Sequence, residues 1–419
     1  MLLDGVRKRP RILFLTSHWP LASAYGAQQR VLNIARLLAR FGDLSFVIAP
    51  TEIEDEETFR RTQSEFEVRG IIRPVQVAPE RPLGKLVHKL RHEFDPTYMA
   101  TDPYTVGEPD RAALQELIQE HDLVWVHTIR TAHWFRNYRW PHSVLDVDDL
   151  PSRTYHSAAQ SGSSPARRLI DLRMAWIWRR RERTFPKRFD VLTVCSKEDQ
   201  RYLGGQDNIH IIPNCFQAIT EHPRTSSETP RIGFIGNCNF APNEEGVKWF
   251  IREVWPAIKR KSPSAQLRLV GRGSEGHLTR LGPDVVGLGW LEDPGEEIAS
   301  WSAMIVPIKI GAGTRVKVAE GFARKCPVVA TAIGVFGYDV HHGEEILLAE
   351  RADDFASACL QLLSNSKLGE ALSERAYQRF LERWTWNLFE NTVSTVIQEC
   401  IARGNLSLHN ESQTVLPLS

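Results

Sequence analysis

The segment with the clearest chemical potential is a glycine-rich loop between an apolar strand and a helix. It reads Pro307-Ile-Lys-Ile-Gly-Ala-Gly-Thr-Arg-Val-Lys317 and continues as Val-Ala-Glu320. Where a buried strand ends in Gly-x-Gly and a helix begins, several backbone N–H groups and the positive end of the helix dipole point at one spot. Such a spot suits a diphosphate.

The charged residues of this segment support that interpretation. Arg315 and Lys317 stand in the first turn, where they repel the helix dipole, so an anion that compensates for them best explains their presence. The carboxylate of Glu320, on the second turn, is suited to accept hydrogen bonds from ribose hydroxyls. An alternative stays open, in which Lys317 and Glu320 form an ordinary surface i,i+3 pair and the glycines merely turn the chain.

The elements that must position this loop alternate between strands and helices. Arg11–Thr16 is a short apolar strand, a helix with apolar residues at Val31, Ile34 and Leu38 follows, and Leu44–Ala49 is a second strand. Further strands are expected at 123–126, 143–147, 191–195, 231–235, 266–270, 285–288, 303–307 and 327–331, and helices at 244–259, 314–324, 352–364 and, as two pieces, 370–402. This alternation predicts the α/β class with doubly wound parallel sheets.

A chain of 419 residues is too long for one hydrophobic core, so two domains are expected. We predict an N-terminal Rossmann-like domain at 1–215, a linker at 216–230 and a second Rossmann-like domain at 231–385. A helix at 386–403 is expected to close the first domain, and 404–419 to form a flexible tail.

At this point the C-terminal half, from Arg231 to about Trp386, resembles the donor domain of retaining family 4 glycosyltransferases. The N-terminal half resembles the family's acceptor domain less strongly. The motifs that carry the resemblance are Gly233-Phe-Ile-Gly236, Val270-Gly-Arg-Gly273, Gly289-Trp-Leu-Glu-Asp293, Pro307, Gly311-Ala-Gly-Thr-Arg-Val-Lys317, Glu320-Gly-Phe-Ala, Pro327-Val-Val-Ala-Thr331 and Gly334, with Gly26, Val124–His127, Asp190–Ser196 and Ile212-Pro-Asn214 in the first half.

The resemblance implies the GT-B architecture, in which two Rossmann-like domains face a central cleft. It also implies transfer of a sugar from a nucleotide diphosphate sugar to a glycan or lipid-linked acceptor, with retention at the anomeric carbon and with neither metal nor cofactor. Glu320 matches the second carboxylate of the family's Glu-x7-Glu motif. Ala312 stands in place of the first, as in a subgroup whose loop reads Gly-x-Gly-Thr-Arg-x-Lys.

The site residues follow from these motifs. Arg315 and Lys317 are expected to neutralise the leaving diphosphate, and His127 matches a histidine that faces the donor sugar in relatives. Gly26, at the start of the first helix, is expected to bring backbone close to the donor phosphates or the acceptor; the alternative is a plain loop glycine. The donor-binding residues are expected to be Gly236, Gly271, Trp290, Leu291, Gly311, Ala312, Gly313, Thr314, Val316 and Glu320.

Composition narrows the partners. A net charge of +1 gives no overall attraction to nucleic acid, and six scattered cysteines indicate neither a zinc site nor a disulfide framework. No segment reaches the length of a membrane span, so we expect a cytoplasmic protein, at most peripheral to the membrane. The basic segment Arg167–Arg188, which contains Trp176 and Trp178, suits an anionic membrane surface or is the solvated face of a packing helix.

The carboxylates of Asp146, Asp148 and Asp149 suggest a metal site, but strand alternation separates them, and loop capping or acceptor contact explains them. Two other functions stay open. A nucleotide-sugar epimerase would bind the same donor, and a non-catalytic GT-B scaffold protein is compatible with Ala312. A Rossmann dehydrogenase is disfavoured, because no Gly-x-Gly-x-x-Gly follows Leu15.

Overall fold

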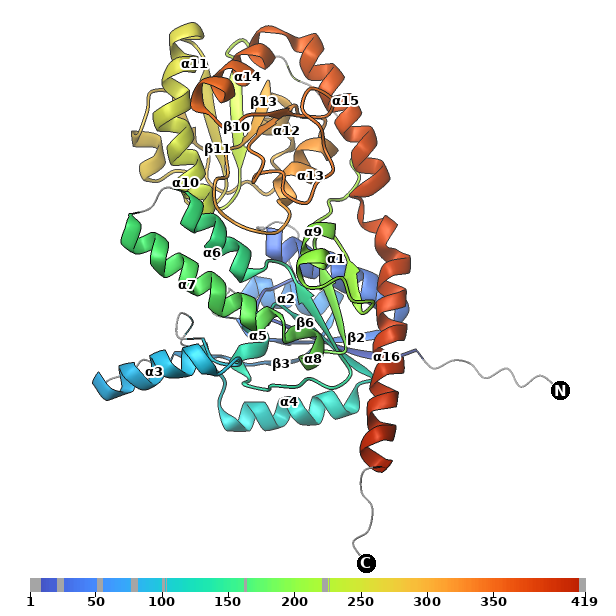
Figure 1. The fold of residues 1–419 in the computed structure, drawn as a ribbon. Helices are drawn as coiled ribbons and strands as arrows, with labels where there is room; N and C mark the ends of the chain where they lie inside the picture. Colours follow the sequence, from blue (N-terminus) through green and yellow to red (C-terminus); the bar gives the residue numbers. More distant parts are fainter. Residues whose placement is uncertain are drawn as a thin grey trace, which may run out of the picture. The chain divides into compact units, whose positions relative to one another are not determined.

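The computed structural model describes residues 9–20, 26–50, 56–76, 82–99, 102, 104–161, 164–220, 225 and 227–413. The chain divides into two compact units, each built on one parallel sheet (Figure 1). The first unit comprises 1–149, 176–212 and 389–419, and the second comprises 150–175 and 213–388.

The sheet of the first unit has seven parallel strands in the order β3-β2-β1-β6-β7-β8-β9. Its strands β1 and β6 are apolar over most of their length, as a sheet covered on both faces requires. The strands are β1 (Arg11–Thr16), β2 (Asp43–Ile48), β3 (Glu67–Ile71), β6 (Leu123–His127), β7 (Ser143–Val147), β8 (Val191–Val194) and β9 (Ile209–Ile211).

The first helix of this unit, α1 (Gly26–Phe41), buries Val31, Ile34 and Leu38 as the spacing predicts. The last helix, α16 (Glu390–Gln413), packs along α1 and against β6 to β9 (Figure 1). The remaining elements are α2 (Glu56–Glu65), α3 (Pro82–Phe94), α4 (Glu108–Glu120), α5 (Ile129–Trp134), α8 (Phe185–Arg188), α9 (Lys197–Tyr202) and an antiparallel pair of β4 (Val75–Gln76) and β5 (Tyr104–Thr105).

The second unit holds six parallel strands in the order β12-β11-β10-β13-β14-β15. Phe250, Ile258 and Phe355 belong to one apolar core, and Trp301, Phe322 and Phe380 to another, so the sheet is doubly wound. Its elements are β10 (Arg231–Ile235), β11 (Gln266–Val270), β12 (Val285–Gly287), β13 (Ala303–Val306), β14 (Val328–Ala330), β15 (Leu347–Leu348), α6 (Pro151–Gln160), α10 (Ala241–Trp249), α11 (Trp255–Lys261), α12 (Gly295–Ala299), α13 (Val316–Ala323), α14 (Ala352–Ser364) and α15 (Ser366–Arg383).

Several boundaries differ from the sequence predictions. Residues 150–175, expected in the N-terminal domain, belong to the second unit because α6 bonds there: the Ser157 hydroxyl accepts a hydrogen bond from Gly311 N at 3.2 Å. Helix α7 (Pro165–Glu182) begins in the second unit and ends in the first. The expected helix at 244–259 is split by a π-helical segment, Phe250–Val254, ahead of Pro256.

The linker and tail predictions need correction too. Phe216, at the start of the expected linker, is buried in the core of the second unit and its N–H bonds to Trp384 O. Residues 404–413 of the expected flexible tail are helical, and 414–419 lie outside the described residues. The helix continues through Gly404, where a Cβ would lie 2.0 Å from His142 Nδ1, so close packing accounts for this glycine.

In the described part of the chain, no helix has the length and apolarity needed to cross a membrane.

Candidate active site

The loop between β13 and α13 has the form that the sequence predicts. Gly311 and Gly313 adopt φ values of 138° and 72°, which L-residues with side chains rarely adopt. Arg315 occupies the N-cap position of α13 without a side-chain cap. The first N–H groups of the helix therefore keep their hydrogen-bonding capacity for a ligand.

The backbone of this loop is held in place by contacts within the second unit. Thr314 Oγ1 accepts a hydrogen bond from Asn214 N at 3.1 Å, and Asn214 Nδ2 donates to Thr314 O at 3.1 Å. The hydroxyl of Tyr338 donates to Arg315 O at 2.9 Å. Because both Asn214 and Thr314 are buried, the loop is pre-organised before any ligand arrives.

Two cations flank the loop. Arg315 Nη1 donates to Ala312 O at 2.6 Å, while its Nε and Nη2 are buried and have no hydrogen-bond partner among the described residues. Lys317 Nζ lies 2.9 Å from Asn243 Oδ1 and 4.0 Å from the centre of the Phe234 ring. Burial lowers the pKa of Lys317 to about 7, and Arg315 acts in the same direction. In the described chain neither cation has a salt-bridge partner, so this edge of the sheet carries uncompensated positive charge.

The strand ends beside the loop require glycine. A Cβ on Gly236 would lie 2.7 Å from Lys317 Nζ, and one on Gly271 would lie 2.1 Å from Gly236 O. Both glycines have φ values in the left-handed half of conformational space. The two strand ends and Lys317 therefore meet at one place, where backbone can approach a ligand closely.

The remaining predicted donor-binding residues lie along the same edge. Gly271 N donates to Gly289 O at 2.7 Å, which brings the following residues, Trp290 and Leu291, beside the end of β11. Trp290 is 47% exposed and Leu291 is partly buried. Val316 opens α13 itself. The structure thus brings together all the site residues predicted in the second unit.

Glu320 is buried one turn into α13, and its Oε1 accepts a hydrogen bond from Arg324 Nε at 3.1 Å. Burial raises its pKa, and Arg324 partly opposes this rise. An ordinary surface pair between Lys317 and Glu320 is not what forms, since Lys317 bonds to Asn243 and Glu320 to Arg324. Asn243 and Arg324 orient the two charged groups, and neither residue was predicted from the sequence to belong to the site.

His127 and Gly26 belong to the first unit. Gly26 is the first residue of α1 and is partly buried, and residues 21–25 before it lie outside the described part. His127 is the last residue of β6 and has no exposed surface. Its Nδ1 lies 2.9 Å from Asp146 Oδ2.

Asp146 itself is not the loop-capping or acceptor-contacting carboxylate that we expected. It is completely buried, and Arg30 binds it with two hydrogen bonds, Nη2 to Oδ1 at 2.6 Å and Nε to Oδ2 at 3.0 Å. Thr193 Oγ1 donates to Oδ1 at 2.7 Å. The signal in the sequence was a charged residue within an apolar pattern, Arg30 among the apolar positions of α1 and Asp146 inside β7.

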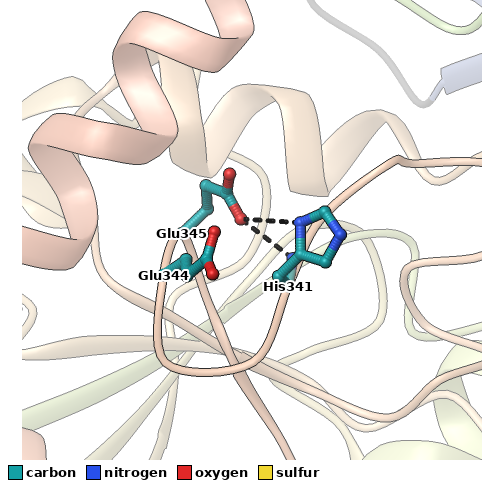
Figure 2. A group of neighbouring side chains, drawn as sticks. All are labelled: His341, Glu344 and Glu345. Carbon is teal, nitrogen blue, oxygen red and sulfur yellow. Dashed lines mark hydrogen bonds and ion pairs between the residues drawn. The ribbon is translucent and has the colours of Figure 1, made fainter.

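Figure 2 shows the group of described residues that meets the distance criterion for a metal site: His341, Glu344 and Glu345. The contacts within it are those of a turn, with His341 N donating to Glu345 Oε2 at 2.8 Å. Arg379 Nε approaches Glu345 Oε1 at 3.8 Å, which opposes a second cation there. We assign this group no role in the site.

One segment of the chain matches a family of known proteins. Residues 229–365, about a third of the chain, match the family model described as glycosyl transferases group 1. A protein from Klebsiella pneumoniae, described as an uncharacterized 44.6 kDa protein in the cps region, is 25% identical over 157 residues. That match spans 35% of this chain and 40% of the length of the Klebsiella protein.

Solved structures are similar over almost the whole chain. Sucrose-phosphate synthase from Thermosynechococcus elongatus has a TM-score of 0.65 at 16% identity, covering 94% of this chain and 100% of its own. Anabaena HepE, solved with UDP and glucose, has a TM-score of 0.62 at 15% identity, with 93% and 99% covered. A variant of S. aureus TarM, solved with UDP and glycan ligands, has a TM-score of 0.63 at 11% identity, with 94% and 100% covered.

At these identities the structural matches establish the fold alone. The family model adds a match to one family for a single segment. The two Rossmann-like parallel sheets have the GT-B fold of these structures, and residues 229–365 match the model of group 1 glycosyl transferases.

Proposed function

We propose that the protein is a glycosyltransferase that moves a sugar from a nucleotide diphosphate sugar to a hydroxyl group of a glycan or lipid-linked acceptor. The observation that carries the proposal is the N-terminus of α13, where uncapped N–H groups meet two cations without a carboxylate partner in the described chain. A diphosphate supplies the missing negative charge and the missing hydrogen-bond acceptors.

The proposed reaction places the diphosphate on the Gly311–Thr314 loop. The free N–H groups of Arg315 and the ammonium group of Lys317 stabilise the charge that develops on the leaving nucleoside diphosphate. Glu320 holds the ribose, and the base lies against the backbone near Trp290–Glu292. Because two side chains neutralise the leaving group, we propose that the reaction needs no metal ion.

The family resemblance carries one further part of the proposal, retention of configuration at the anomeric carbon. The HepE and TarM structures contain UDP, so uridine nucleotides are the first donors to test. We propose the same class of donor for this chain on the strength of the shared fold and the geometry of the Gly311–Lys317 loop.

The first part of α7 supports peripheral contact with an anionic membrane. Leu169, Ile170 and Trp176 are 70%, 55% and 56% exposed, and Arg168 and Arg173 are exposed beside them. Such a combination suits a membrane interface. In a sedimentation assay the wild-type protein should pellet with phosphatidylglycerol vesicles. An Ile170→Ser, Trp176→Ser variant should stay in the supernatant.

The second part of the basic segment has a structural role instead. Trp178 is 1% exposed, so it does not belong to this surface. Arg181 and Arg188 are also buried, and each donates hydrogen bonds to backbone carbonyl groups, such as Tyr98 O and Tyr138 O. The proposed membrane surface therefore comprises only the first part of α7, and not the whole segment Arg167–Arg188.

Turnover of nucleotide sugars tests the proposed function. UDP-, GDP- and ADP-sugars are incubated with and without glycan or polyprenyl-phosphate acceptors, in EDTA, and released nucleoside diphosphate is measured. The proposal expects release that depends on the acceptor, with a product whose anomeric proton shows the donor's configuration by NMR. Interconversion of donor sugars without release indicates an epimerase instead, and tight binding without turnover indicates a scaffold protein.

A further inference from the structure

Helix α6 contacts the start of the Gly311–Lys317 loop through serine hydroxyl groups. Ser157 Oγ accepts a hydrogen bond from Gly311 N at 3.2 Å and donates to Lys309 O at 3.5 Å. Ser161, four residues later, donates to Lys309 O at 3.1 Å. Residues 150–175 and 213–388 form one compact unit, so these contacts lie within a single body of the protein. Helix α6 is therefore part of the surroundings of the loop, although 154 positions separate Ser157 from Gly311.

The hydroxyl group of Ser157 fixes the orientation of the peptide at Gly311. Ser157 is 9% exposed, and its contact with Gly311 N is partly buried. Gly311 adopts a φ of 138°, a conformation that only glycine adopts freely. Because glycine has many accessible backbone conformations, a hydrogen bond to its N–H selects one orientation among several.

The orientation of Gly311 in turn decides where the guanidinium group of Arg315 can lie. A Cβ on Gly311 would stand 2.2 Å from Arg315 Nη2, so the guanidinium group fills the space that the absent side chain leaves. Arg315 Nη1 also donates to the carbonyl group of the next residue, Ala312, at 2.6 Å. A turn of the Gly311 peptide would therefore displace both the space and the carbonyl group that hold Arg315.

Other contacts anchor the segment on either side of Gly311. Before it, Lys309 Nζ lies 3.9 Å from the centre of the Trp249 ring. After it, the hydroxyl and carbonyl groups of Thr314 are held by the hydrogen bonds described above. Neither of these anchors acts on Gly311 itself, whereas Ser157 bonds directly to its N–H.

Resting on the proposed function, we propose that Ser157 is a positioning residue of the donor site. Its hydroxyl group fixes the Gly311 peptide and, through Gly311, the guanidinium group of Arg315 that stabilises the leaving diphosphate. Ser157 acts through these two residues and not by touching the substrate. Helix α6, which the sequence led us to expect in the N-terminal domain, thus contributes to the donor site of the second unit.

Hydrogen–deuterium exchange of the free, full-length protein tests the first link, from Ser157 to Gly311. Ser157→Ala should speed exchange of the Gly311 amide by about two- to tenfold, the worth of one hydrogen bond. Gly334 is the internal control, because its N–H bonds to the Thr331 hydroxyl at 3.0 Å in the same unit. Its exchange should stay unchanged. Unchanged exchange at Gly311 overturns the proposal.

Two further variants separate the hydroxyl group from the helix that carries it. Alanine is the best helix former, so Ser157→Ala retains α6 itself. Ser157→Thr keeps the hydroxyl group and should show nearly the wild-type exchange at Gly311. Ser357→Ala is the matched control on another helix of the unit, where the exposed hydroxyl bonds only to Asp353 O among the described residues. It should leave exchange at Gly311 unchanged.

A double-mutant cycle tests the second link, from Gly311 to Arg315. UDP, GDP and ADP are titrated calorimetrically into the wild type, Ser157→Ala, Arg315→Ala and the double variant. Ser157→Ala should weaken binding of the preferred nucleotide by about three- to tenfold in the wild type and by less than about twofold once Arg315 is absent. A role in general stability alone predicts the same factor in both backgrounds, and that result overturns the proposal.

Failure of the proposed function gives a different result. If none of the three nucleotides binds the wild type, the donor site itself is wrong. Urea denaturation of the same four proteins then decides on the positioning role: the loss of stability from Ser157→Ala should shrink in the Arg315→Ala background. Equal losses in the two backgrounds overturn the inference about Ser157 as well.

Discussion

At the carboxyl edge of the first sheet, the cation Arg30 is neutralised inside the protein by Asp146, whereas at the edge of the second sheet Arg315 and Lys317 form no salt bridge in the described chain. Both edges belong to doubly wound parallel sheets, so the fold alone does not cause the difference. The cations of the second edge are therefore left to bind an anion, as we propose, whereas the cation of the first edge is already paired within the protein. Two sheets of similar topology thus differ in whether the positive charge at their carboxyl edge is neutralised.

The largest expected effect concerns the uncompensated arginine. Arg315→Ala should lower kcat of sugar transfer by about 100- to 1000-fold, the size typical for loss of one pre-organised donor to developing charge. Steady-state kinetics with the preferred nucleotide sugar measure it. Arg351→Ala is the matched control, since its exposed side chain carries the same charge on the same unit. An equal loss of kcat in both variants would contradict a special role of Arg315 at the edge of the second sheet.

The second effect concerns the close approach of strand ends at the anion edge. Gly271→Ala combines a φ of 125° with a Cβ only 2.1 Å from Gly236 O, so the backbone must shift. Gly343→Ala has a φ of 80° but open space around the new Cβ. Gly343→Ala should lose about 1–2 kcal/mol of unfolding free energy and Gly271→Ala clearly more, by urea denaturation. Similar losses would show that the packing at Gly271 is not tight.

The affinity for the nucleotide sugar should depend on pH through Lys317, at the edge of the second sheet. The pKa of Lys317 is about 7 in the free protein, and a bound diphosphate raises it, so binding takes up a proton above pH 7. Affinity for a nucleotide sugar should fall by up to tenfold per pH unit between pH 7 and 8.5, by calorimetric titration. Cys238 and Glu320, the other titratable groups near Lys317, have raised pKa values, with that of Cys238 at about 11.

Two lysine variants sharpen this test. Lys317→Met should bind weakly with a flat pH profile, while Lys325→Met, which removes the same charge beyond the far end of α13, should keep the wild-type slope. Folding stability gives an independent reading. Because burial holds the folded-state pKa of Lys317 below its usual value of 10.5, the unfolded chain binds more protons between pH 7 and 10.5, and stability rises with pH there. Lys317→Met should remove that rise.

The smallest effect concerns the ribose contact. Glu320→Gln should raise KM for the nucleotide sugar by about tenfold, the equivalent of about 1.4 kcal/mol for weakened hydrogen bonds to hydroxyl groups. The effect should be smaller for a 2′-deoxyribonucleotide donor, whose missing hydroxyl makes the residue less important. An equal rise for both donors would indicate that Glu320 acts only through Arg324.

Much of the fold could be predicted from the sequence, because strands buried on both faces are continuous apolar runs. The strands at 11–16, 123–127, 231–235 and 266–270 were located to within a residue. Edge strands could not be located in this way. β3, Glu67–Ile71, alternates between exposed and partly buried residues, and β15 has only two residues, so neither leaves a recognisable apolar run.

The site was predictable where it depends on local sequence and hidden where it depends on long-range pairing. The Gly311–Lys317 loop is one continuous motif, so its residues lie as expected. Arg30 and Asp146 are 116 positions apart, and only the parallel pairing of distant strands brings them together. The same holds for α6, whose Ser157 reaches Gly311 across 154 positions.

Calorimetric titration of nucleoside diphosphates into the wild-type protein and the Arg315→Ala variant tests the central claim most directly, that the N-terminus of α13 binds the donor diphosphate. UDP, GDP and ADP are titrated in EDTA, with Arg351→Ala as the charge-matched control. We predict that one nucleotide binds the wild type and the control equally and binds Arg315→Ala at least tenfold more weakly. Binding of none of the three, or binding that Arg315→Ala leaves unchanged, would contradict the account.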